Sequence, residues 1–290
     1  MAIERKTKLL ERVGVAALLV GLAACSPMNE GEGEGEVAVN AGGEGGGYSA
    51  PAGEGEGEGE GESGEGSGGG EFGIKAAQAA ENPVTYLTAL EVMRAHYLAG
   101  LAAYDVDRRA VAAEMFTHPI SEIYVDLEDV LIELGAPVFG DALQAAAAAP
   151  YDGSSDEDIR AAASVVLAAI DDVETYAPQS EYPAAAVQAQ VLTNMIVRAA
   201  LQYEFAMASD APNGPYLDGY GFFKSAEVIS SRHMEEIRSL DGVVADALSH
   251  AMTALANAYP TVVAPEQATA DANNLVALAD AASAAAERLE

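Results

Sequence analysis

The stretch NPVTYLTALEVMRAHYLAGLAAY, residues 82–104, decides the fold class of this chain. Its first two residues, Asn82 and Pro83, form a helix start, because an Asn side chain accepts from exposed backbone N–H groups and Pro suits the first turn. Apolar residues then recur every three or four positions, and this stripe consists of Tyr86, Leu90, Met93, Tyr97 and Leu101. Such spacing predicts a helix with one buried face that ends near Tyr104.

The same helical periodicity continues through residues 75–290, which are rich in Ala and contain few alternating β-branched runs. We expect further helices at 107–116, 119–134, 137–149, 155–176, 183–209, 216–240, 242–259 and 264–289. The short connections between them favour antiparallel packing. The predicted fold class is therefore all-α, an antiparallel helical bundle with either one core or two four-helix-like halves at 75–150 and 154–290.

Residues 1–24 predict a lipoprotein signal peptide. A basic start is followed by an apolar run at 13–24, which is shorter than the roughly 20 residues that span a bilayer. The sequence Leu22-Ala23-Ala24-Cys25 resembles the lipobox of bacterial lipoproteins, in which the Cys thiol receives a lipid. We therefore expect Cys25 to anchor the protein in the cell envelope, and Ser26 after it favours the outer membrane, on its periplasmic or surface side.

Residues 25–74 predict a disordered Gly/Glu-rich linker. The segment 26–74 contains twelve Glu and 19 Gly but no Lys or Arg. A segment of this composition cannot bury enough apolar surface to offset the entropy lost on ordering. As a flexible coil it would reach roughly 40 Å. We expect it to act as a spacer between the lipid anchor and the helical domain.

The charge of residues 75–290 limits the partners of the domain. It is near −22, which is the chain's −32 without the +2 of the signal peptide and the −12 of the linker. Such a surface repels nucleic acid and anionic headgroups and attracts cations. We therefore expect no nucleic-acid partner. The expected partners are the membrane through the lipid anchor and either a metal ion or a membrane transport protein.

The main candidate metal site consists of His96, Glu114, His118 and Glu122. His118 lies four residues from each of the two Glu residues, which is the spacing of neighbours on one helix face. A chain reversal after the helix at 82–104 would bring His96 to this segment. Two imidazoles and two carboxylates suit an iron, copper or zinc ion.

A structural role for the same histidines is the alternative. His118 precedes Pro119 and would then only cap a helix at 119–134. His96 would sit in the core, bonded to Tyr124 or to a carboxylate. The sequence leaves both interpretations open.

A second, weaker metal site is formed by His233 and Glu236, three residues apart on a predicted helix, with His250 from the next helix. No Gly-rich phosphate loop, HExxH sequence or nucleophile motif occurs in the chain. We therefore predict no catalytic residues and expect that the protein is not an enzyme.

Residues 199–229, AALQYEFAMASDAPNGPYLDGYGFFKSAEVI, resemble a recurrent pattern of imelysin-like periplasmic proteins and of the extracytoplasmic bundle of iron permeases. The matching positions are Tyr203, Glu204, Tyr216, Asp218, Tyr220, Gly221 and Phe222. The resemblance implies an all-helical, membrane-tethered fold associated with iron uptake. Imelysins carry a Gly-x-His-x-x-Glu motif early in the domain, whereas here His233-x-x-Glu236 lies late and lacks the Gly. The resemblance therefore supports the expected fold more strongly than it supports a metal site.

Two hypotheses follow for the function. The first is a membrane-anchored extracytoplasmic lipoprotein that binds a metal ion, iron-related, without catalysis. The second is a structural or protein-interaction lipoprotein with no metal site. Convergence of the His96 group in the folded chain would favour the first hypothesis, and scattered histidines with an exposed apolar patch would favour the second.

Overall fold

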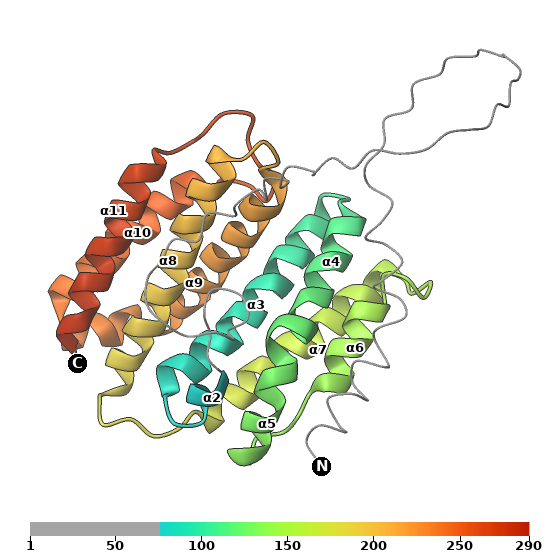
Figure 1. Cartoon of the computed structure of the whole chain (residues 1–290), viewed down its shortest axis with the longest axis horizontal. Coiled ribbons are helices and arrows are strands. Elements are labelled where there is room, and N and C mark those ends of the chain that lie inside the picture. Colours follow the sequence, from blue (N-terminus) through green and yellow to red (C-terminus); the bar gives the residue numbers. More distant parts are fainter. Residues whose placement is uncertain (1–75, 290) are drawn as a thin grey trace, which may run out of the picture. The chain divides into compact units, whose positions relative to one another are not determined.

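In the computed structural model, helix α3 (Pro83–Asp105) lies between two groups of helices (Figure 1). Its start is the predicted one, because the Asn82 side chain accepts from the N–H groups of Val84 and Thr85 at 2.9 and 3.1 Å. On one side α3 contacts α4 and α7, and on the other it contacts α8 and α9. The stretch that indicated the fold class from the sequence is thus a central helix of the domain.

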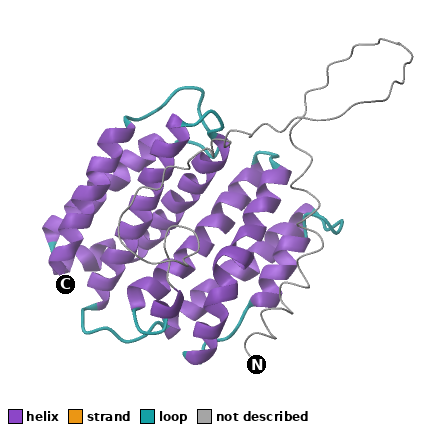
Figure 2. Cartoon of the chain, in the orientation of Figure 1, coloured by secondary structure: helices purple, strands orange, loops and turns teal. Residues whose placement is uncertain are grey.

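The structure describes residues 76–289, and every regular element among them is helical (Figure 2). The elements besides α3 are α2 (Ala76–Ala79), α4 (Arg109–Pro119), η2 (Ile120–Tyr124), α5 (Val125–Glu133), α6 (Gly140–Ala148), α7 (Asp156–Val173), η3 (Glu174–Tyr176), α8 (Ala184–Ala208), α9 (Asn213–Leu240), α10 (Gly242–Ala258), α11 (Ala272–Ala286) and η4 (Glu287–Leu289). The all-α prediction is confirmed. The predicted signal peptide at 1–24, Cys25 and the linker at 25–74 lie outside the described residues.

The described helices pack as a series of neighbours around α3. Helices α8 and α9 form the most extensive pair, and α10 and α11 pack against them on the side away from α3 (Figure 1). Helices α4, α6 and α7 pack together on the other side of α3. Because α3 contacts α8 and α9 directly, residues from before and after 150–154 share packing contacts, and all described residues fall in one compact unit.

The expected helix start at Pro119 is wrong. Helix α4 runs through His118 to Pro119, and the chain continues without a break into the π-helical turn η2 and then α5. Pro119 lacks a backbone N–H, and the next residue, Ile120, donates to Thr117 O. The chain therefore stays helical around the Pro, and His118 lies in the last turn of α4 instead of capping a later helix.

The expected helix at 264–289 begins eight residues late, at Ala272. Tyrosine hydroxyls hold the preceding loop: that of Tyr203 accepts from the N–H groups of Thr269 and Ala270, and that of Tyr216 donates to Thr261 O. These contacts satisfy backbone groups that a helix would otherwise pair. Two other starts shift by three residues, since α6 begins at Gly140 and α9 at Asn213.

Helix α8 has the length and apolarity of a membrane-crossing helix, with a mean hydropathy of 1.2 over its most apolar window. In the described domain, however, 56% of that window is buried. The helix packs against α9, α11, α3 and α10. Its apolar character is therefore accounted for by the core of the bundle.

Two glycines let α9 approach its neighbours closely. A Cβ at Gly221 would lie 2.5 Å from the Ala95 carbonyl oxygen of α3 and 3.1 Å from the Ala99 Cβ. A Cβ at Gly219 would collide with the Tyr259 hydroxyl. The α3–α9 contact thus depends on the absence of a side chain at Gly221.

A buried ion pair of Glu91 with Arg94 lies where α3 meets α7 and α9, and it connects to acidic groups nearer the surface. Arg94 Nε lies 3.1 Å from both carboxylate oxygens of Glu91, and the two residues are only 3% and 4% exposed. Ser225 donates to Glu91 Oε2 at 2.5 Å, and Arg94 also contacts Glu174 and, at 3.0 Å, Asp171. Burial raises the pKa of Glu91 to about 7, although the charge of Arg94 opposes the rise.

This pKa predicts a pH dependence of stability. Between pH 4.5 and 7 the folded state binds more protons at Glu91 than the unfolded state, so the free energy of unfolding falls as the pH rises. We expect the fall from this one group to be on the order of a few kcal/mol across that range. Glu91→Gln should remove this part of the slope, as measured by urea unfolding at several pH values. Glu235→Gln, an exposed change on α9, should keep the wild-type slope, and an unchanged slope in Glu91→Gln would contradict the assignment.

Candidate metal centre

Three of the predicted ligands meet beside α3. His96 comes from the middle of α3, His118 from the last turn of α4 and Glu122 from η2. One ligand atom from each residue lies within 4.8 Å of the other two. Within residues 76–289 this is the one such group of three or more His, Cys, Asp or Glu side chains.

His96 is held in an orientation that suits a metal ligand. The side chain is 2% exposed, and its Nδ1 lies 2.8 Å from the Val92 carbonyl oxygen one turn earlier. Since a carbonyl oxygen can only accept, Nδ1 carries the proton and the lone pair of the neutral ring is on Nε2. Metal-binding histidines commonly donate their second ring N–H to a carbonyl in this way.

His118 and Glu122 approach the buried ring from the surface side. The rings of His96 and His118 lie edge to face, with centroids 5.8 Å apart and planes at 74°. Glu122 Oε2 lies 3.9 Å from His96 Nε2, and the Glu122 side chain is 35% exposed. The group therefore combines one ligand fixed in the core with two that solvent can reach.

Two imidazoles and one carboxylate form a ligand set used for zinc and iron. Ligand bonds of about 2.0–2.2 Å place neighbouring ligand atoms roughly 3–3.5 Å apart around an ion. The His96–Glu122 distance of 3.9 Å is already close to this range. Small rotations of the His118 and Glu122 side chains, both only partly buried, would bring the three ligand atoms to the spacing found around one ion.

The fourth predicted ligand of this site, Glu114, lies outside the group. Glu114 is exposed on α4, and its charge acts on Tyr151: burial and then Glu114 raise the pKa of that tyrosine. Its spacing of four residues from His118 predicts Glu114 as a ligand. The structure instead brings together the two histidines and the later carboxylate.

The weaker site is only partly assembled. His233 Nδ1 lies 3.5 Å from Glu236 Oε2 on α9, with the His side chain 28% exposed. His250 is exposed on α10 and belongs to no converging group in the described part of the chain. His233 and Glu236 thus form a surface pair of a kind common on helices.

The contact of α9 with His96 was not predicted as part of the site. The Phe222 ring lies edge-on to His96, with centroids 6.4 Å apart and planes at 85°. Asp218, one turn before Phe222, lines a narrow crevice together with His96, and this crevice has no room for a water-sized molecule. In the sequence these two residues stand out only through the family resemblance. Gly221 between them is the sequence feature that marks the close approach to α3.

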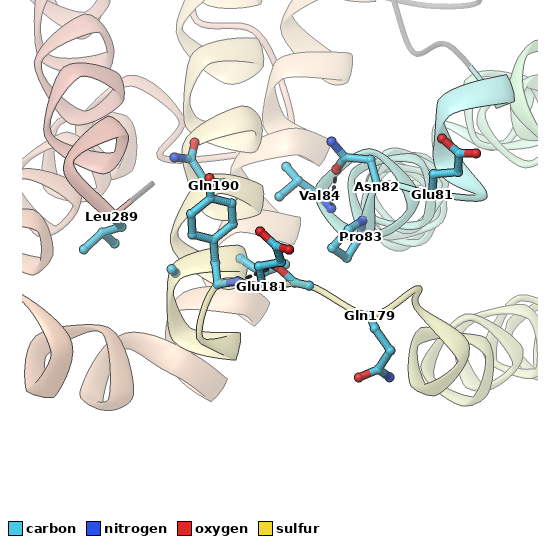
Figure 3. Close-up of a pocket in the computed structure, with 12 residues that line it drawn as sticks. Glu81, Asn82, Pro83, Val84, Gln179, Glu181, Gln190 and Leu289 are labelled. Atoms are coloured by element: carbon cyan, nitrogen blue, oxygen red, sulfur yellow. Dashed lines mark hydrogen bonds between the residues drawn. The ribbon is translucent and has the colours of Figure 1, made fainter.

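A separate pocket of about 290 Å³ shares no residue with the His96 group. It lies between the start of α3, the loop before α8, the first turns of α8 and Leu289 (Figure 3). In Figure 3, Glu181 and Asn82 lie beside the same space from two different segments. Its lining is mixed in character and includes two exposed acidic residues, Glu81 and Glu181.

Comparison of the chain with protein-family models, with curated proteins and with solved structures finds no match. The observations that bear on function are the N-terminal sequence and the geometry of the His96 group.

Proposed function

We propose that this protein is a membrane-anchored, extracytoplasmic helical lipoprotein that binds one transition-metal ion without catalysis. The ion would be held by His96, His118 and Glu122. The observation that carries the proposal is the convergence of these three ligand atoms to within 4.8 Å of one another. The proton of His96 on Nδ1, bonded to Val92 O, supports the same conclusion because it leaves the Nε2 lone pair for the ion.

The small space beside His96 suits a protein that binds an ion without catalysis. The crevice that His96 shares with α9 has no room for a water-sized molecule, whereas pockets that enclose a small organic ligand measure roughly 300–1,000 Å³. A bare ion needs no such pocket. The acidic domain also favours the approach of cations.

The cellular setting of the proposal comes from the sequence. Cys25 would be the lipidated residue, and the Gly/Glu linker would hold the helical domain away from the membrane. We place the protein in the cell envelope, at the outer membrane. The resemblance of residues 199–229 to imelysin-like proteins favours iron among the candidate metals and a membrane transport protein as a partner, with copper and zinc as the other candidates.

The second candidate function is a protein-interaction lipoprotein without a metal. Leu201 and Phe205 favour it, because they lie one turn apart on α8 and are 39% and 62% exposed. Exposed apolar neighbours of this kind are found at contact surfaces between proteins. In this case the three ligand residues would serve only the packing of α3 against α4.

Metal titration of the full chain distinguishes the two functions. We expect one equivalent of Fe²⁺, under anaerobic conditions, or of Zn²⁺ or Cu²⁺ to bind at neutral pH, as measured by calorimetry. At 100 times its Kd the ion should add about 2.7 kcal/mol to the free energy of unfolding. Binding should weaken at acid pH because protons compete for the imidazoles. If none of the three ions binds stoichiometrically, the metal function is wrong and the interaction function remains.

A further inference from the structure

The helical segment that carries Glu122 contains an unusual turn. Residues Ile120–Tyr124 form the π-helical turn η2, in which the N–H of Val125 donates to the carbonyl of Ile120 five residues earlier. A π-helical turn holds one more residue than the α-helix would and is rare. It occurs here at the segment that supplies Glu122 to the candidate metal centre, two residues after His118.

Pro119 is the sequence feature that precedes this turn. Its missing N–H removes one α-helical hydrogen bond, and its ring crowds the carbonyl four residues earlier. The next residue, Ile120, donates to Thr117 O, three residues back, before the chain widens into η2. The helix around Pro119 therefore departs from regular α geometry without ending.

The end of the π-helical turn is fixed in the core by Tyr124. This side chain is fully buried, and its hydroxyl accepts from the N–H of Phe139 at 2.9 Å. Its ring also packs edge-on against the Phe139 ring at 5.0 Å. Tyr124 thus fixes the position of the helix after the turn.

The extra residue controls the direction of Glu122. In an α-helix a residue four positions later lies about 40° beyond a full turn, and one three positions later lies about 60° short of it. A wider turn brings the fourth residue closer to the line of His118. In this arrangement Glu122 Oε2 reaches to 3.9 Å from His96 Nε2 on the neighbouring helix.

We propose that the π-helical turn is the positioning element of the metal centre. The extra residue aims the Glu122 carboxylate at His96, and Ser121, an exposed residue inside the turn, is the residue whose removal would restore α-helical geometry. This inference rests on the proposed function, because it concerns the same ion. It adds that the affinity for the ion depends on the backbone geometry of η2 as well as on the ligand residues themselves.

Deletion of Ser121 tests the proposal. The shortened turn should close as an α-helix, so that Tyr124 and α5 keep their buried positions while Glu122 comes only three residues after His118. We expect the melting temperature and the helical circular dichroism to stay near wild type. The Kd for Zn²⁺ should rise at least about tenfold, which is the range seen when residues that orient metal ligands are lost. With Co²⁺ as probe, the visible absorption band should change because the carboxylate ligand is lost.

Two further variants complete the experiment. Ser121→Ala keeps the residue count and should bind Zn²⁺ like wild type. Pro119→Ala restores the missing N–H, and if the deletion variant does not fold it provides the same comparison: we expect weaker Zn²⁺ binding with unchanged or higher stability. If a folded variant that lacks the π-helical turn binds Zn²⁺ and Co²⁺ as wild type does, the positioning role is wrong and the proposed function still holds. If wild type itself binds no metal, both are wrong.

Discussion

Alanine at His96 or at His118 is expected to abolish stoichiometric metal binding, with the affinity falling at least about 100-fold, beyond the 10- to 100-fold loss seen for residues that only orient ligands. Each change removes one of three protein ligands, and the two that remain cannot enclose the ion. The measurement is calorimetric titration of each variant with the metal that wild type binds most tightly.

The two histidines differ in what else they do, and this difference makes the experiment informative. His96 is 2% exposed, so its removal also opens a cavity and lowers stability. His118 is only partly buried, so His118→Ala should keep nearly wild-type stability in the absence of metal. His250→Ala is the matched control, because His250 is exposed on α10 and outside the group. Full binding by His118→Ala would contradict the site.

Alanine at Gly221 should be one of the most destabilising single-methyl additions in the described domain, costing about 3 kcal/mol or more. The new Cβ would lie 2.5 Å from the Ala95 carbonyl oxygen, and a backbone atom inside a helix cannot move aside as a flexible side chain can. Helix α9 would have to shift away from α3. The free energy of unfolding, from urea denaturation, measures the effect.

The same substitution at Gly214 is the control. Gly214 lies in the first turn of the same helix, and a Cβ there would meet no atom within 4 Å. Gly214→Ala should therefore leave stability unchanged or raise it by up to about 1 kcal/mol, since Ala favours a helix more than Gly does. Equal effects at the two positions would show that α9 and α3 are not packed as closely as described.

The sequence predicted those parts of the fold that depend on local chemistry. The Asn82 cap and the helix start at Ser155 are present where the sequence placed them, because each depends on residues within one turn; at Ser155 the structure shows a capping box with Asp158. The start of α11 was missed because hydroxyls of Tyr203 and Tyr216, far away in sequence, hold the loop before it. Such long-range contacts produce no periodic pattern in the sequence.

The sequence predicted only part of the candidate site, because local spacing identifies ligand residues but does not fix how they pack. His96, His118 and Glu122 were named from residue type and spacing, and their convergence needs only that α4 folds back along α3. Glu114 was named by the same spacing, but the helix faces are set by packing, which leaves Glu114 exposed. The π-helical turn was not foreseen, because Pro119 was interpreted as a helix start and not as an interruption within one.

Helix α3 also has a consequence for how this sequence can vary. Sixteen of its 23 residues are buried, and they include Glu91, Arg94 and His96 with their polar partners. A helix enclosed on nearly all sides has almost no surface where replacements are neutral, since each side chain fits either a neighbour's shape or a neighbour's charge. Sequence change during evolution is therefore expected to be concentrated in the outer helices of the domain. The sequence of α3 is expected to change most slowly.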